Sequence, residues 1–331
     1  MSFQRIIGQH QAIKILQEEI VASSISGAYL FAGPDGVGKT LTALTFAKTL
    51  NCKKGGIDSC DNCSSCRKID HLNHPDVHII TPDGDHIKIE QIRSLKKEIV
   101  YRAYEGKKKI WIIQEADKLT LEASNSLLKT LEEPPSDSVL ILISQSREKL
   151  LPTILSRCEI IRFLPLSSRE IESLISKYLP PGSPKLPLIV KLARGKVGEA
   201  LRLTKEEKLL RERGDILNQL SRNLSVEEIF NTASEWKNYD TEKLENILDI
   251  LLFWFHDLLI LKLNERENKW LINLDRIPQL KEQKKIYSFR AIKRAIETIE
   301  KTKNYLNTNV NRRTTLEVMG LKLREYRNSN H

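Results

Sequence analysis

The glycine-rich stretch GPDGVGKT, residues 33–40, has the spacing of a phosphate-binding loop. It matches the pattern G-x-x-x-x-G-K-[ST] and stands between an apolar run and an amphipathic segment, the context that such a loop requires. Gly33, Gly36 and Gly38 let backbone N–H groups surround phosphates, Lys39 reaches the outer phosphates, and Thr40 holds Mg²⁺. The motif predicts a site for ATP or ADP.

The pair Gln114 and Glu115 bears on whether a bound nucleotide is hydrolysed. An ATPase usually carries one carboxylate for the magnesium shell and a second one that orients water, side by side at the end of a core strand. Here the pair follows the apolar run 110–113. Glu115 is the candidate base, but neutral Gln114 brings no charge to a hard cation, so Mg²⁺ should be held weakly. The alternative is an ordinary strand followed by a helix cap.

Four cysteines form a cluster within residues 52–66: Cys52, Cys60, Cys63 and Cys66. In a reducing compartment such spacing favours a metal over disulfides. Four thiolates suit tetrahedral Zn²⁺, and a site that uses four protein ligands is structural rather than catalytic. An iron–sulfur cluster and unliganded thiols are the alternatives.

Arg157 stands in the segment TILSRCEIIRF, directly before an apolar run. A planar, permanently charged guanidinium at such a place suits an arginine finger that is presented to the γ-phosphate of a neighbouring subunit. An ordinary surface arginine is the alternative.

The elements that must position these residues follow an alternating pattern. Between residues 20 and 165, short apolar runs alternate with amphipathic segments, which predicts a parallel sheet with helices on both faces. Strands are expected at 28–33, 77–82, 108–116, 139–145 and 159–166, and helices at 39–50, 87–104 and 121–133.

Beyond Pro165 the pattern becomes helical. We predict an α/β domain at 1–165 with the cysteine insert at 52–66, a small helical lid domain at 166–205, and an all-helical domain at 206–331. The apolar helix around Trp254 and Phe255 is either part of the core or a subunit interface.

Composition limits the functional classes. The net charge of +10 over 331 residues is a weak indication of a polyanionic partner. The opening residues lack the features of a secretory leader, and no uncharged run reaches membrane-spanning length. The sequence therefore predicts a cytoplasmic protein without membrane contact.

Several motifs occur together in an order that resembles a known family. They are GQHQAIKIL, GPDGVGKT, the four-cysteine insert, NSLLKTLEEPP, ILSRC and NVNRRTTLEVMGLKL. Together they are similar to the delta-prime subunits of the bacterial DNA polymerase III clamp loader, AAA+ proteins related to tau/gamma, nearly from end to end. The resemblance implies an AAA+ nucleotide-binding domain, a helical lid and a helical collar that joins a hetero-oligomer.

The resemblance also implies a role in replication. Such a subunit is a stator that helps to load the sliding clamp onto primer–template DNA, with tau/gamma and delta subunits as partners. Arg157 would complete the ATP site of an adjacent motor subunit. Ser144 falls where the family senses nucleotide, and Gly198 replaces the lid arginine of motor subunits. Gln114 and Gly198 together predict a subunit that binds nucleotide but hydrolyses it poorly.

Two other functions stay open on the sequence. One is a motor subunit of the tau/gamma type, which would hydrolyse ATP in its own loop with Glu115 as base. The other is a stand-alone nucleic-acid-binding zinc module with a nucleotide switch, suggested by the basic charge and the cysteine cluster.

Overall fold

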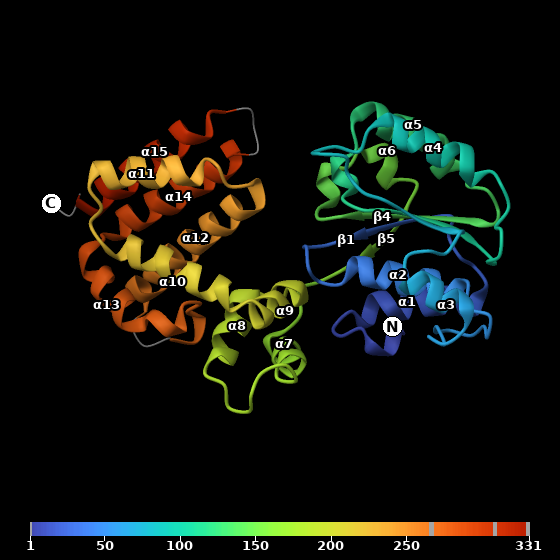
Figure 1. The fold of residues 1–331 in the computed structure, drawn as a ribbon, viewed down its shortest axis with the longest axis horizontal. Coiled ribbons are helices and arrows are strands. Elements are labelled where there is room, and N and C mark those ends of the chain that lie inside the picture. The colour runs from blue at the N-terminus through green and yellow to red at the C-terminus, as the bar shows by residue number, and fades with distance from the viewer. Residues whose placement is uncertain (1, 265–267, 307–309, 329–331) are drawn as a thin grey trace. The chain divides into compact units, whose positions relative to one another are not determined.

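The chain forms two compact units in the computed structural model, which describes residues 2–264, 268–306 and 310–328. The first unit contains the residues up to Lys177 together with Ala193–Ala200, and the second contains Tyr178–Leu192 and the residues from Leu201 on (Figure 1). Residues 166–205, predicted to form a separate lid, are thus divided between the two units. The three-domain division stays a prediction.

A five-stranded sheet forms the centre of the first unit. Its strands are all parallel and lie in the order β2-β3-β4-β1-β5. They are β1 (Ala28–Ala32), β2 (Val77–Ile80), β3 (Lys109–Ile113), β4 (Ser138–Ser144) and β5 (Glu159–Arg162). The carboxyl ends of parallel strands meet at one edge of the sheet and the amino ends at the other.

Helices cover both faces of this sheet, as Figure 1 shows. On one face lie α1 (His10–Ala22), α2 (Lys39–Leu50) and α3 (Ser64–Asp70), and on the other lie α4 (Ile89–Ile99), α5 (Leu121–Glu132) and α6 (Pro152–Leu155). Side chains alternate along each strand, so Tyr29 and Phe31 pack in the core on the α1–α2 side while Leu30 packs on the α4–α5 side. The predicted fold class, a parallel α/β domain followed by helices, is confirmed.

Helix α4 ends at Ile99, five residues before the predicted end at residue 104. The prediction was wrong because the N–H groups of residues 104–106 donate to a buried carboxylate, Asp76, and so cannot form the hydrogen bonds of a helix. The Asp76 oxygens accept from the backbone N of Tyr104 at 2.5 Å, Glu105 at 2.9 Å and Gly106 at 2.7 Å. Residues 100–108 therefore form a loop at the amino edge of the sheet.

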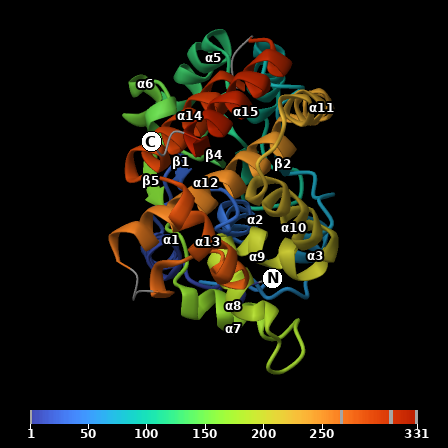
Figure 2. The ribbon, with the colours of Figure 1, turned by 90° about the vertical axis from the view of Figure 1, so that its left-hand side faces the viewer.

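The remaining helices follow the strands. They are α7 (Ser168–Ile175), α8 (Lys185–Ala193), α9 (Val197–Lys205), α10 (Glu207–Ser221), α11 (Val226–Trp236), α12 (Thr241–Leu263), α13 (Ile277–Ile286), α14 (Phe289–Leu306) and α15 (Arg312–Asn328). In the second unit α12 packs against α14, and α14 lies beside α15 (Figures 1 and 2). Trp254 and Phe255 of α12 are fully buried in this core, so they are packing residues rather than a surface for another subunit. No helix in the described ranges is long and apolar enough to cross a membrane.

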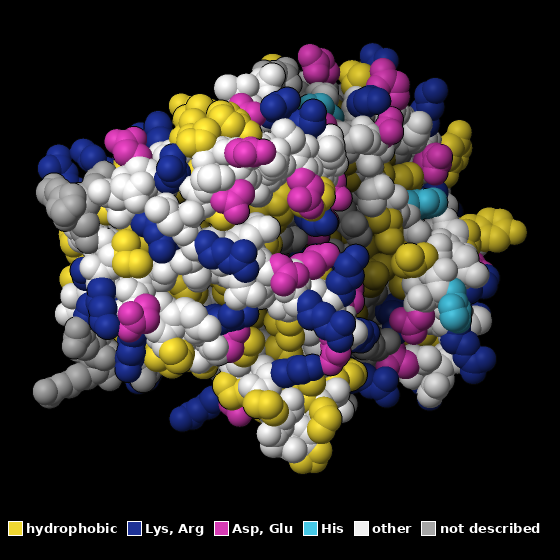
Figure 3. Space-filling model, turned by 60° about the vertical axis from the view of Figure 1, so that its left-hand side comes forward, with side chains coloured by type: hydrophobic (Ala, Val, Ile, Leu, Met, Phe, Trp, Pro, Cys, Tyr) yellow, Lys and Arg dark blue, Asp and Glu magenta, His cyan; other side chains and the backbone are white. Residues whose placement is uncertain are grey.

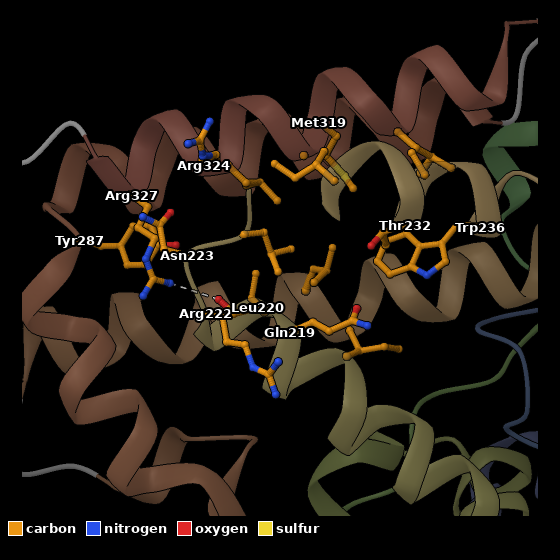
Figure 4. Close-up of a pocket in the computed structure, with 18 residues that line it drawn as sticks. Gln219, Leu220, Arg222, Asn223, Thr232, Trp236, Tyr287, Met319, Arg324 and Arg327 are labelled. Atoms are coloured by element: carbon orange, nitrogen blue, oxygen red, sulfur yellow. Dashed lines mark hydrogen bonds between the residues drawn. The ribbon is translucent and has the colours of Figure 1, made fainter. Parts of the chain in front are cut away.

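A small, mostly apolar cavity of about 90 Å³ lies among α10, α11 and α15 of the second unit (Figure 4). Trp236 and Met319 line it, and Arg327 donates from Nη1 to the Leu220 carbonyl at 3.3 Å beside it. None of the residues predicted to bind nucleotide or metal lines this cavity.

Candidate nucleotide site and candidate metal site

The glycine loop connects the carboxyl end of β1 to the first residue of α2. Gly36 and Gly38 have φ angles of 71° and 102°, which disfavour residues with a side chain. A Cβ on Gly33 would stand 2.2 Å from the carbonyl oxygen of Phe163, so glycine is required there for close approach. The loop thus leads directly into the N-terminus of α2, where free backbone N–H groups could bind phosphate oxygens.

Lys39 is buried at the base of this loop, with only 5% of its surface exposed. Its Nζ donates to the carbonyl oxygens of Gly33 at 2.5 Å and Pro34 at 2.7 Å. Burial lowers the pKa of the Lys39 ammonium, and the negative charges of Asp35 and Asp117 oppose that change. The ammonium protons of Lys39 face the loop that would hold the phosphates, while Thr40, the next residue, is half-buried.

Ser144 ends β4 beside the glycine loop. Its carbonyl accepts from the Gly33 N–H at 3.2 Å, and its hydroxyl lies 3.1 Å from Asp117 Oδ1. The carboxyl end of β4 thus brings together Ser144, which was a predicted site residue, and Asp117, which was not. The spacing could have indicated Asp117, because it lies three residues beyond Gln114 in the same acidic turn.

Gln114 and Glu115 follow the carboxyl end of β3, the strand next to β4. Gln114 continues the sheet through its N–H, which donates to the Ile80 carbonyl at 2.9 Å. Glu115 adopts a left-handed backbone conformation with a φ of 49°, and its carboxylate pairs with Lys118 at 2.6 Å. This hydrogen bond raises the pKa of Lys118. The candidate base is therefore engaged by a local cation.

Gly198, at the start of α9, lies directly against the glycine loop. Its N–H donates to the Gly36 carbonyl at 2.9 Å, and a Cβ on Gly198 would stand 3.3 Å from the Gly36 Cα. Gly198, which lies more than 160 positions beyond Gly36 in the chain, thus contacts the glycine loop through its backbone. The resemblance places an arginine side chain at this position in motor subunits.

Arg157 lies at the other end of the sheet. It precedes β5, whose first residue, Glu159, pairs with Tyr29 near the start of β1, whereas the glycine loop follows the end of β1. Five strand residues span about 15 Å. The Arg157 guanidinium donates to Glu132 of α5, with Nε 2.7 Å from Oε1, and to the Thr153 carbonyl. Its side chain is 31% exposed. It therefore reaches the surface at the amino edge.

The four clustered cysteines converge on one point. Their sulfur atoms all lie within 4.8 Å of one another, and the Sγ atoms of Cys60 and Cys66 are 4.0 Å apart. Tetrahedral zinc with Zn–S bonds of about 2.3 Å needs sulfurs about 3.8 Å apart. Cys52 and Cys66 are fully buried, whereas Cys60 and Cys63 are half-buried. The donor set and its spacing fit one metal ion.

Backbone N–H groups prepare part of this cluster for metal binding. The N–H groups of Asn62 and Cys63 lower the pKa of the Cys60 thiol to about 6. Burial raises the pKa of Cys63, but N–H groups of Cys66 and Lys53 outweigh it, so the net change is a lower pKa. Burial raises the pKa of Cys66. A thiolate is the form that binds metal, so two of the four ligands are already favoured.

A buried lysine fixes the cysteine insert to α2 and α3. Lys48 is 1% exposed, and its Nζ lies 2.5 Å from Asp61 Oδ1 and 2.8 Å from Asp70 Oδ1. Burial disfavours the Lys48 ammonium, but these hydrogen bonds outweigh burial and raise its pKa. Cys158 lies outside the cluster; burial raises the pKa of its thiol to about 12, so it is inert.

Two family models match the chain. The model for the DNA polymerase III delta subunit matches residues 8–167, and the model for the C-terminal part of that subunit matches residues 207–324. The DNA polymerase III subunit delta-prime of Bacillus subtilis (strain 168) is 33% identical over 322 residues, which cover 96% of each chain. The DNA polymerase III subunit tau of the same organism is 30% identical over 286 residues, 78% of this chain and 50% of tau. The chain therefore belongs to the delta-prime family of DNA polymerase III clamp-loader subunits.

Proposed function

We propose that this chain is a stator-like subunit of the clamp loader, which helps to load the sliding clamp onto primed DNA in the cytoplasm. Its partners are tau/gamma and delta subunits, and it reaches the clamp and primer–template DNA through the complex. In this role Arg157 acts in trans as the arginine finger of a neighbouring ATPase subunit.

The position of Arg157 supports this role most directly. An arginine finger that acted on nucleotide bound to this same chain would have to lie at the carboxyl edge of the sheet, beside the glycine loop. Arg157 lies at the amino edge instead, partly exposed and held by Glu132. Because Glu132 is itself 48% exposed, this ion pair costs little to break when a phosphate approaches.

The site around Lys39 supports nucleotide binding with poor hydrolysis. Lys39, Thr40 and the glycines are the residues that hold phosphates. Three residues disfavour hydrolysis. Neutral Gln114 would bring no negative charge to Mg²⁺, and the carboxylate of Glu115 is paired with Lys118. Gly198 supplies a backbone N–H instead of a cationic side chain. Ser144 would sense the nucleotide from the strand end. ATP or ADP with weakly held Mg²⁺ is the ligand we assign.

The four cysteines would hold one structural Zn²⁺. The metal would supply a rigid cross-link between the end of α2, the loop 52–63 and the start of α3. Support comes from the convergence of the four sulfurs and from the two lowered thiol pKa values.

The proposed trans role of Arg157 is tested in a complex reconstituted with tau/gamma and delta subunits. Arg157→Ala should lower DNA-stimulated ATP hydrolysis at the neighbouring site by about 10³-fold or more. Arg162→Ala, which removes an exposed arginine at the opposite end of β5, is the control and should leave the rate unchanged. A full rate with Arg157→Ala would contradict the proposal.

A motor subunit of the tau/gamma type is the second candidate, favoured by the intact glycine loop and Glu115. It predicts that the isolated chain turns over ATP with Mg²⁺ and that Lys39→Ala abolishes this turnover. The stator role predicts nucleotide binding, lost in Lys39→Ala, with turnover near background in both proteins.

A further inference from the structure

The loop at residues 100–108 exposes aromatic side chains among basic ones. Val100, Tyr101 and Tyr104 are 65%, 69% and 86% exposed, so three large side chains with apolar surface are grouped within five residues of the chain. Residues 93–109 contain seven lysines and arginines and two glutamates, a net charge of +5. Half of the chain's net charge of +10 is therefore concentrated in this segment. Figure 3 shows a face on which basic and acidic side chains are intermixed.

The exposed side chains stand on a rigid support. Asp76 is fully buried and binds the N–H groups of residues 104–106; these bonds outweigh its burial and hold its pKa below the usual value. Asn51, at the end of α2, accepts from the N–H groups of Lys107 at 2.8 Å and Lys108 at 2.9 Å and donates to the Lys108 carbonyl. Two buried polar side chains thus fix the backbone on both sides of Gly106.

The loop is also joined to the cysteine insert. Lys68 of α3 donates to both carboxylate oxygens of Glu105, at 2.8 Å and 2.6 Å. His74, which is buried, lies 3.0 Å from the Ser65 hydroxyl through Nε2 and accepts from the Asp76 N–H through Nδ1. The pairing of Glu105 leaves the aromatic side chains flanked by Arg102 and Lys107, both exposed.

We propose that this loop is a binding surface for single-stranded nucleic acid, with Tyr101 and Tyr104 stacking on bases and Arg102 and Lys107 contacting phosphates. Exposed tyrosine rings supply stacking surfaces that accept any base, and basic side chains between them follow the backbone. Three residues span at most about 11 Å, so the two rings can engage one short stretch of strand. A protein partner is less suited to this surface, because lysine is depleted at protein interfaces and five of the seven basic residues in 93–109 are lysines.

The surface contains neither Arg157 nor the glycine loop, so its binding of nucleic acid and the proposed function can fail independently of each other. The surface should bind without marked sequence preference, because a tyrosine ring can stack on any base.

The test uses the full chain and fluorescence anisotropy of a labelled oligothymidylate. Tyr101→Ala and Tyr104→Ala should each weaken binding by about tenfold, whereas the Tyr→Phe variants keep the ring and bind like the unmodified chain. Lys107→Ala should reduce the slope of log affinity against log salt concentration by about one. Tyr178→Ala, which removes a tyrosine that is 56% exposed elsewhere, is the control.

Three results would overturn the proposal. The first is no binding of the oligothymidylate. The second is equal binding of a fully paired duplex with no effect of the Tyr→Ala changes, which would mean simple charge attraction. The third is that the Tyr→Ala changes weaken association with another protein subunit and leave oligothymidylate binding intact. Circular dichroism of each variant verifies that the fold is retained.

Discussion

The two edges of one sheet carry different chemistry. At the carboxyl edge lies a nucleotide site with its phosphate-holding residues and without the charged residues that hydrolysis needs: Gln114 is neutral, and Gly198 contributes only a backbone N–H. At the amino edge lie four cysteines, whose sulfurs could hold one metal ion, and the partly exposed Arg157. Under the proposed role, the carboxyl edge would bind nucleotide with little turnover, while the amino edge would supply a residue that acts on a neighbouring subunit.

Removal of the metal is expected to have the largest effect on the amino edge. Cys66→Ser should abolish zinc binding and lower the free energy of unfolding by about 4 kcal/mol, because the loop loses its central cross-link. Metal analysis and chemical denaturation measure the two quantities. Cys158→Ser, outside the cluster, should keep about one zinc per chain. Iron and visible absorbance in place of zinc would identify the iron–sulfur alternative instead.

Lys48→Met tests how much the buried ion pairs hold the insert in place. The change removes the cation that binds the carboxylates of Asp61 and Asp70, which are 23% and 41% exposed, and we expect a loss of about 2 kcal/mol in the free energy of unfolding. Lys54→Met, on an exposed neighbour, should cost little. Equal losses in the two variants would show that the ion pairs do not stabilise the insert.

The same ion pair predicts a response to acid. Hydrogen bonds from Lys48 and Ser59 outweigh burial and lower the pKa of Asp61 to about 2, below the value of about 3.9 for an unfolded chain. A lowered pKa in the folded state contributes stability above about pH 4 that is lost as the pH falls toward 2. Denaturation between these pH values should show this loss in the unmodified chain. In Lys48→Met the dependence should be weaker, and an unchanged dependence would assign it to other carboxyl groups.

Gln114→Asp is expected to have the smallest effect, and it acts on the carboxyl edge. A carboxylate in place of the amide should tighten magnesium-dependent nucleotide affinity by about tenfold, because Mg²⁺ prefers charged oxygen ligands. Turnover should stay low while Gly198 and the Glu115–Lys118 pair are unchanged. Gln114→Asn is the neutral control. If the Gln114→Asp chain hydrolysed ATP readily, the neutral side chain of Gln114 alone would explain the poor ATP hydrolysis that we propose for this chain.

Local sequence patterns predicted most of the sheet and both candidate sites. The glycine loop and the cysteines could be identified because their residues lie within a few positions of one another, so that chain geometry alone brings them together. Strands β1, β3 and β4 were recognisable as apolar runs buried on both faces, whereas the edge strands β2 and β5 are partly exposed.

Contacts between distant residues explain what the sequence could not predict. The end of α4 depends on Asp76, which lies 28 residues before Tyr104. The contact of Gly198 with Gly36, the ion pair of Arg157 with Glu132 and the position of Asp117 beside Ser144 all depend on tertiary packing. The pairing of Glu115 with Lys118 is local, but the left-handed backbone at Glu115 could not be predicted, because this conformation at a non-glycine residue has no reliable sequence pattern.

The trans role of Arg157 is tested most directly by a comparison of Arg157→Ala with Lys39→Ala in the same reconstituted complex. DNA-stimulated ATP hydrolysis is measured for each variant beside the unmodified subunit. The trans role predicts that Arg157→Ala strongly lowers hydrolysis, whereas Lys39→Ala leaves it close to the unmodified rate because this chain's own site contributes little turnover. The opposite pattern, with loss of hydrolysis in Lys39→Ala and a full rate in Arg157→Ala, would contradict the account and identify the chain as a motor subunit.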